Sequence, residues 1–167
     1  MPCYAAVMAE PNRRYYTPRG KTLAWITRIH RRLYLATDGR LGSRVYAVAE
    51  KGHGFLLRPM EILLLTTTGR KTGRARTVPL PYFAYDGRTL LVASFAGGPK
   101  HPAWYHNLVA NPAVDVQLGR AHHRAHAEVL DADMRDIYWQ QLTHDWPRYG
   151  VYQETCPRTI PLIDLVW

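Results

Sequence analysis

Two stretches near the middle of the chain decide its fold, EILLLTTT at residues 61–68 and TVPLPYFAYDGRTLLVASF at residues 77–95. The first is a continuous apolar and β-branched run, which indicates a buried strand. In the second, Asp86-Gly87 separates two strand-like runs at residues 77–85 and 89–95, and this dipeptide between such runs is a strong hairpin signal. The centre of the chain is therefore predicted to be a β-sheet.

The β pattern continues toward the C-terminus, with one short helix inserted. Residues 101–109 fit a helix, which Asn111-Pro112 closes. Residues 113–118 alternate strictly between apolar and polar side chains, as in a strand with one buried face. Gly119-Arg120 then turns the chain into a further strand at about residues 122–130.

Helices are predicted at both ends of this β region. Asp131 is suited to cap a helix that runs to about His144, and an aromatic-rich stretch at 146–152 and a last strand at 159–167 follow it. Toward the N-terminus, apolar residues recur near helical spacing, and Asp38-Gly39 stops the pattern. The apolar positions are Leu23, Trp25, Ile26, Ile29, Leu33 and Leu35, and the basic residues between them are Lys21, Arg28, Arg31 and Arg32.

Short strands joined by hairpins, with helices set apart from them, indicate an α+β fold on a barrel-like sheet rather than on βαβ units. We expect residues 1–44 to form an N-terminal arm and amphipathic helix, and residues 45–167 to form the barrel domain. The C-terminal helix and aromatic flap should pack onto the barrel, because neither part is large enough to stand alone.

The charge of the chain favours anionic partners. Its 22 Lys and Arg against 13 Asp and Glu give a formal net charge of +9. No run approaches the roughly 20 apolar residues of a membrane-spanning helix, and no basic region precedes the short apolar N-terminus as in a signal peptide. Cys3 and Cys156 show no metal or redox spacing, so we expect reduced thiols in a cytoplasmic protein.

A basic glycine turn, TGRKTGRAR at residues 68–76, directly follows the first strand. It lacks the GxxxxGK[ST] spacing of a Walker loop. Glycines nevertheless let the backbone turn tightly and expose N–H groups, which can form an anion-binding concavity. Arg70 and Arg76 suit bidentate contacts with phosphate or carboxylate, and Lys71 and Thr72 add a charge and a hydroxyl. The alternative is an exposed hairpin loop with solvated charges.

A second loop of similar character, SFAGGPKHPAWYHN, occupies residues 94–107. Here another strand ends in a glycine pair, followed by Lys100 and a helix that carries Trp104 and Asn107. If the two strands pair, both loops open onto one pocket, with Trp104 as a flat wall and Asn107 as a hydrogen-bonding partner. A core position for Trp104 is the alternative.

Taken together, LLLTTTGRKTGRARTVPL, YDGRTLLVASFAGG and KHPAWYHNLVANPAVDVQL resemble the deazaflavin (F420)-dependent nitroreductase family. The later segments IYWQQL, WPRYGVYQ and RTIPL extend the resemblance over about residues 62–165. The resemblance implies a split β-barrel and a reductase that passes a hydride from reduced F420 to a quinone-like, enone or nitroaromatic acceptor. Family membership would place the phosphate and polyglutamate tail of F420 on the basic turn, and its ring on the strands and helix that follow.

Residue by residue, the resemblance implies two sets of contacts. The cofactor-binding set is Arg70, Lys71, Thr72, Arg76, Thr77, Val78, Pro79, Leu80, Pro81, Val92, Ala93, Ser94, Phe95, Lys100, Ala103, Trp104, Tyr105, His106 and Asn107. The substrate set is Ser94, Trp146, Tyr149 and Tyr152.

The sequence departs from the family pattern at three places. Phe95 stands where the nitroreductases have Lys, and Trp146 replaces a Tyr. The segment 43–59, which leads to the first strand, is longer than the corresponding segment of the family. The first two changes lie on the substrate side and leave the cofactor-tail positions intact.

No catalytic residue is assigned, because a deazaflavin carries the hydride chemistry itself and the protein supplies binding and orientation. Ser94, Tyr149 or Tyr152 could stabilise or protonate the reduced acceptor, and Tyr149 is the first candidate for substrate contact.

Other interpretations stay open. An FMN enzyme on the same barrel would need fewer cations. A non-catalytic anion-binding module is a different class, with the basic N-terminal helix on an acidic membrane surface. Nucleic-acid binding is not expected, and a metal site at His122 and His126 is disfavoured because Arg124 lies between them. The chain could be a monomer or a homodimer.

Overall fold

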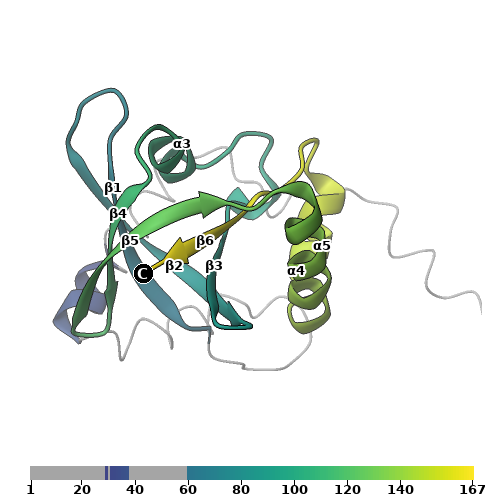
Figure 1. Cartoon of the computed structure of the whole chain (residues 1–167), viewed down its shortest axis with the longest axis horizontal. Helices are drawn as coiled ribbons and strands as arrows, with labels where there is room; N and C mark the ends of the chain where they lie inside the picture. Colours follow the sequence, from purple (N-terminus) through teal and green to yellow (C-terminus); the bar gives the residue numbers. More distant parts are fainter. Residues whose placement is uncertain (1–28, 30, 38–59) are drawn as a thin grey trace, which may run out of the picture.

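The computed structural model describes residue 29, residues 31–37 and residues 60–167 (Figure 1). Six strands form a closed barrel in the order β1-β2-β3-β6-β5-β4, and every neighbouring pair is antiparallel. The strands are β1 (Ile62–Thr68), β2 (Ala75–Tyr85), β3 (Arg88–Val92), β4 (Ala113–Leu118), β5 (Ala121–Val129) and β6 (Leu162–Val166).

The direction of the strands brings two loops to the same end of the barrel. Strands β1 and β3 both run antiparallel to β2, so they point the same way and the loops that follow them leave from one end. Strands β1 and β3 do not pair with each other, because β2 lies between them. The two loops nevertheless emerge at the same end of the barrel.

Two turns show why the hairpins form where they do. Asp86 and Gly87 both adopt positive φ, 50° and 78°, as a tight two-residue turn between paired Tyr85 and Arg88 requires. The predicted DG hairpin is thereby confirmed. Gly119, also at positive φ, joins β4 to β5.

Helices α3 (Ala103–Ala110), α4 (Ala132–Asp145) and α5 (Arg148–Thr155) lie outside the sheet (Figure 1). Helix α3 covers the end of the barrel from which the two loops emerge. Helices α4 and α5 lie along one side. Asp131 caps α4 as predicted, because its Oδ1 accepts a hydrogen bond from Met134 N at 2.9 Å. The stretch 146–152, expected as an aromatic flap, is largely the helix α5.

The apolar side chains form two cores because several strands are buried on both faces. Inside the barrel, Leu63, Leu91 and Ile163 pack with Trp104 and Leu108 of α3. Outside it, the side chains of α4 and α5 pack on the opposite faces of the same strands. The larger members of this outer core are Ile62, Leu64, Phe83, Leu90, Leu162, Tyr138, Leu142 and Tyr149. The expected packing of the C-terminal region on the barrel is confirmed.

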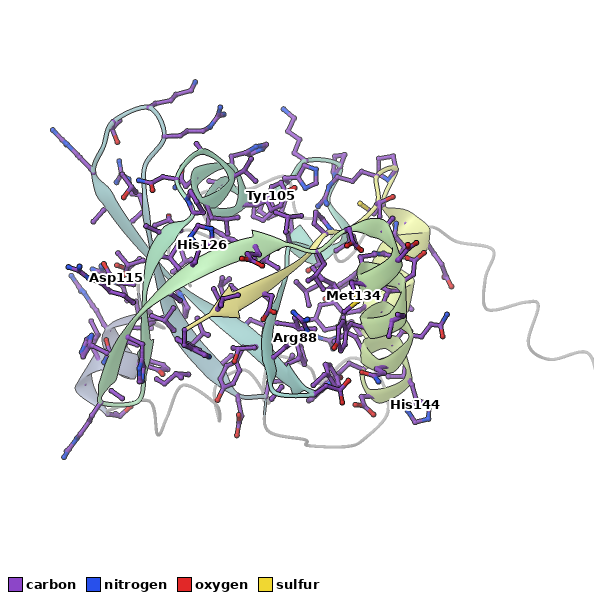
Figure 2. The ribbon with its side chains drawn as sticks, viewed as in Figure 1. Arg88, Tyr105, Asp115, His126, Met134 and His144 are labelled. Atoms are coloured by element: carbon purple, nitrogen blue, oxygen red, sulfur yellow. The ribbon has the colours of Figure 1, made fainter. Side chains whose placement is uncertain are left out.

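Arg88 and Asp164 form an ion pair between the sheet and helix α4. Figure 2 shows Arg88 between the sheet and α4, where its guanidinium pairs with the buried Asp164 carboxylate of β6 and lies over the Tyr138 ring. Pairing is what allows a carboxylate to occupy a site that is otherwise apolar.

The predicted N-terminal helix is described only in part. Residues 31–36 are helical, and the residue that anchors them is Tyr34, which is 1% exposed. Its hydroxyl donates to Ile62 O at 2.9 Å and accepts from Gly119 N at 3.0 Å, at the barrel end opposite α3. Leu35, one of the predicted apolar positions, is instead 48% exposed. The rest of the helix, the boundary at residue 44 and Cys3 lie outside the described residues, whereas Cys156 is a buried free thiol.

Candidate functional site

The site candidates gather at the barrel end covered by α3. The β1–β2 turn at residues 69–74 and the β3–α3 loop at residues 93–102 both open there. Asn107 of α3 joins the helix to the turn, because its Oδ1 accepts from Arg70 N at 3.2 Å and its Nδ2 donates to Thr67 Oγ1 at 3.1 Å. The amide of Asn107 is therefore used within the protein, and this side chain positions the basic turn.

The basic turn is rigidly closed by its own backbone. Gly69 N donates to Arg74 O at 2.8 Å, and Gly73 N and Thr72 N donate to Gly69 O at 2.8 and 3.1 Å. A Cβ on Gly69 would lie 2.9 Å from Thr72 Oγ1 and 3.1 Å from Arg74 O, so this position has no room for a side chain.

This turn does not form the expected concavity of free backbone N–H groups, so that prediction is wrong. The N–H groups of Gly69, Thr72 and Gly73 are used inside the turn, and Arg70 N donates to Asn107. The turn instead offers an anion its cationic side chains. Arg70, Lys71, Arg74 and Arg76 are all exposed, as is Lys100 on the second loop, and within the described residues no ion pair joins any of the five to a carboxylate.

The β3–α3 loop has an unusual backbone. Strand β3 ends at Val92, earlier than predicted, and Phe95, Ala96 and Gly97 follow with φ of 49°, 52° and 75°. Left-handed φ is costly for residues other than glycine, so the surrounding structure must hold Phe95 and Ala96 in place. Gly97 fits tightly against α5, since a Cβ there would meet Thr155 Oγ1 at 2.8 Å.

Trp104 and His101 belong to two different environments. Trp104 is 8% exposed and packs inside the barrel, which is the core position left open by the sequence. His101 stacks on Tyr105, with ring centroids 4.5 Å apart, and its Nδ1 is buried. Burial first, and then the nearby charges of Arg158 and His106, lower the pKa of His101 below its usual value. Figure 2 shows Tyr105 on α3 above the strand ends.

The strand residues named as cofactor contacts alternate between the two faces of the sheet. Val78 and Leu80 of β2 pack against the interior core, and Ala93 is fully buried in it. These three side chains face the barrel core. The intervening residues Thr77, Pro79 and Pro81 therefore lie on the outer face, along with Val92, which packs against the outer core.

The aromatic residues predicted as substrate contacts form one cluster with Phe83 of β2. The Phe83 ring meets Trp146 edge-on at 5.7 Å and Tyr149 at 5.4 Å between centroids, and Tyr149 meets Tyr152 at 5.8 Å. Tyr149 is buried, whereas Trp146 and Tyr152 are half-buried. Because Gly97 contacts Tyr152, the cluster adjoins the loop that carries Ser94 and Phe95.

Sequence reasoning missed three residues of this region. Thr67 is 1% exposed and holds Asn107, and Arg158 donates to carbonyls of the β3–α3 loop. Arg74 is a further exposed cation of the basic turn. Thr67 and Arg158 stand in no recognisable motif, although Arg158 begins the RTIPL segment of the resemblance.

An antiparallel barrel whose two loops at one end carry cations that no carboxylate of the described residues pairs, with an aromatic cluster beside them, defines a barrel protein that binds an anionic cofactor. The chain belongs to the F420H(2)-dependent quinone reductase family, whose model matches residues 26–166. The protein is an F420-dependent oxidoreductase, and the predicted family, cofactor and α+β split-barrel fold are confirmed.

Individual relatives agree with this assignment. The chain is 34% identical over 143 residues to an F420H(2)-dependent quinone reductase of Mycobacterium tuberculosis, a match that covers 84% of this chain and 89% of the relative. Among solved structures, an F420-H2 dependent reductase (FDR-A) is 40% identical with a TM-score of 0.56, over 63% of this chain and 93% of that one. A second, described as a domain-swapped dimer, is 36% identical with a TM-score of 0.57, over 73% and 93%.

The cations on the two loops fit a cofactor with an anionic tail. A tail of phosphate and carboxylate groups needs exposed cations, and the two loops supply five that pair with no carboxylate in the part of the chain that the structure describes. The described part of the chain contains no helix long and apolar enough to span a membrane.

Proposed function

We propose that the protein reduces a quinone with hydride from reduced F420, bound at the barrel end covered by α3. The observation that carries the proposal is the pair of cation-bearing loops at one end of the barrel, one of them fixed to α3 by Asn107, beside an aromatic cluster. The family match supports the reaction class.

In this proposal the tail of F420 binds to the basic turn. Arg70 and Arg76 would contact its phosphate and carboxylate oxygens, with Lys71, Thr72 and Lys100 as further contacts, and all five side chains are exposed. The closed backbone of the turn supports this role, since a rigid turn presents its side chains at little entropic cost.

The ring of F420 is proposed to lie along the outer face of β2 and β3. Thr77 and Pro81 would line one side of it, and Val92, Ser94 and Phe95 the strand end. Pro81 is half-buried and Phe95 is exposed, so both offer apolar surface to a flat heterocycle, whereas Pro79 is buried and would act by fixing the strand. Residues Val78, Leu80, Ala93 and Trp104 would contribute through backbone and by fixing the strands, because their side chains face the core.

Reduced F420 supplies a hydride when bound, and one further proton converts the quinone into the hydroquinone while the cofactor leaves as oxidised F420. The chain's own task is to align donor and acceptor and to keep water out. Trp146, Tyr149 and Tyr152 are proposed to shape the acceptor pocket, and the Ser94 hydroxyl or a tyrosine hydroxyl is proposed to stabilise charge on the acceptor oxygen.

The experiment is a titration followed by turnover. Purified protein is titrated with F420 and, separately, with FMN, and intrinsic tryptophan fluorescence is recorded. Reduced F420 and menadione are then mixed with the protein. Binding of F420 at micromolar concentration and protein-dependent oxidation of the reduced cofactor are expected. Binding of FMN alone, or no oxidation with menadione, would refute the proposal.

We also propose peripheral membrane contact for this cytoplasmic protein, since quinones are apolar and Ile29, Leu35, Arg31 and Arg32 are exposed. Co-sedimentation with phosphatidylglycerol vesicles, and its loss in the Ile29→Ser/Leu35→Ser variant, would test this. Gel filtration with light scattering would distinguish a monomer from a homodimer.

A further inference from the structure

We infer that Arg158, in the linker between α5 and β6, is a positioning residue that clamps the β3–α3 loop into the conformation that binds the cofactor. This inference rests on the proposed function and deepens it, because the loop carries Ser94, Phe95 and Lys100. Arg158 lies 64 residues from Ser94 in sequence, so only the fold brings the two together.

Three main-chain oxygens accept from one nitrogen of the Arg158 guanidinium. Its Nη2 lies 3.0 Å from Ala93 O, 3.2 Å from Ser94 O and 3.1 Å from Lys100 O. The first two carbonyls are at the start of the loop and the third is at its end. The guanidinium therefore ties the two ends of the loop together, as a disulfide or a metal would.

The loop needs such a clamp because its backbone is strained. Phe95 and Ala96 hold left-handed φ angles of 49° and 52°, which only a surrounding structure that favours them can maintain. Two weaker contacts act on the same loop, since Cys156 Sγ donates to Gly98 O at 3.4 Å and Gly97 packs on Thr155. All these contacts come from the segment 155–158.

Arginine is suited to this role in a way that lysine is not. Its planar guanidinium is delocalised and more weakly hydrated than an ammonium group, so it tolerates burial better than a compact charge on a flexible stem. Nε and Nη1 of Arg158 are buried and have no hydrogen-bond partner among the described residues, so Nη2 alone makes the contacts with the loop.

The linker itself is fixed by a separate network. Gln153 Nε2 donates to Arg158 O at 2.9 Å, and Gln153 Oε1 accepts from Arg135 Nη2 at 3.0 Å and from Ile160 N at 2.9 Å. Arg135 bonds to Gln153, Ile160 O and Asp136, and when it is replaced Gln153 keeps its own bonds to Arg158 O and Ile160 N, so the linker that carries Arg158 stays in place. This makes Arg135 a matched control, a half-buried arginine on the same network that should matter for stability alone.

The test compares Arg158→Met, Arg158→Lys and Arg135→Met in the full chain. For Arg158→Met we expect a rise in the Kd of F420 of about tenfold, which corresponds to about 1.4 kcal/mol, and a fall in kcat with the KM for menadione within about twofold. Added guanidinium ion, well below denaturing concentration, should restore part of the F420 affinity. Arg158→Lys should not recover the wild-type affinity, and Arg135→Met should bind F420 as the wild type does.

Hydrogen exchange in the cofactor-free protein separates this inference from the proposed function. We expect faster amide exchange at residues 95–100 in Arg158→Met and unchanged exchange there in Arg135→Met. Equal F420 affinity, kcat and loop exchange in Arg158→Met and the wild type would overturn the inference. Faster loop exchange, together with no F420 binding by the wild type, would instead refute the proposed function and with it the cofactor role of the clamp. If Arg158→Met fails to fold, Arg158→Lys carries the same comparison.

Discussion

Asn107 of α3 and Thr67 of β1 are both buried and are joined by a side-chain hydrogen bond of 3.1 Å between Asn107 Nδ2 and Thr67 Oγ1. The other end of the Asn107 amide accepts from the backbone of the basic turn. One side chain thereby fixes the helix that covers the barrel to the turn that bears the cations, and couples the two halves of the candidate site.

Replacing Asn107 by leucine should damage both stability and cofactor binding. The change leaves Arg70 N without its acceptor and the buried Thr67 hydroxyl without its donor, and a lost partner for a buried group costs about 1–3 kcal/mol. The Kd of F420 should also rise, because the basic turn is no longer held. Urea unfolding and fluorescence titration measure the two effects. Val109→Ala, at an exposed position of the same helix, is the control and should alter neither.

The double variant Arg70→Gln/Lys71→Gln should lose affinity without losing stability. Both side chains are exposed and unpaired with carboxylates among the described residues, so unfolding should change by less than about 0.5 kcal/mol. The Kd of F420 should rise about 10- to 100-fold, as expected for two charge-assisted contacts, and should depend less on salt. Arg124→Gln removes an exposed cation on β5 and should leave the affinity unchanged. Unaltered F420 binding in the double variant would mean that the tail of the cofactor binds away from the basic turn.

Much of the fold could be predicted because its signals are local. The DG turn, the alternation at residues 113–118 and the Asp131 cap each act over a few residues, and each appears where expected. Helix α5 was missed because Pro147 precedes it and Gly150 lies inside it, so its local propensity is poor. It forms because Tyr149 packs into the outer core.

The contacts that build the site could not be predicted in the same way. Barrel closure through β1–β4 and β3–β6, the Asn107–Thr67 bond and the Arg158 clamp all join residues far apart in sequence. The cations of the basic turn could be identified from their spacing in the sequence. The N–H groups of the turn were expected to be free but donate within it, since only the folded turn determines which donors are used. Tyr34, rather than Leu35, is buried because its hydroxyl finds partners on the barrel.

Ala96→Gly should stabilise the protein. Ala96 holds a φ of 52° that glycine adopts freely, so relief of this strain should outweigh the added entropy of the unfolded chain by about 0.5–1 kcal/mol. Thermal unfolding should therefore shift upward. Ala84→Gly in β2, where φ is not positive, should act in the opposite direction. A loss of stability in Ala96→Gly would show that the loop relaxes from its left-handed conformation.

His101 should make the protein less stable as the pH falls. Burial, with the charges of Arg158 and His106, lowers the pKa of His101 in the folded state below the value of 6.5 for an unperturbed histidine. As the pH drops through 6.5 the unfolded chain therefore takes up a proton at this position before the folded protein does. The contribution of His101 to stability is present above that pH and declines until the pH reaches the folded pKa.

Urea unfolding between pH 7.5 and 5.5 measures this contribution as the difference between the wild type and His101→Phe, which retains a ring to stack on Tyr105. The variant should lose less stability over that range. Val109→Ala is the control, because Val109 is exposed on α3 and carries no titratable group. A steeper loss of stability in His101→Phe would mean that the folded protein holds the proton on His101 more tightly than the unfolded chain does, against the sign derived from its burial beside Arg158.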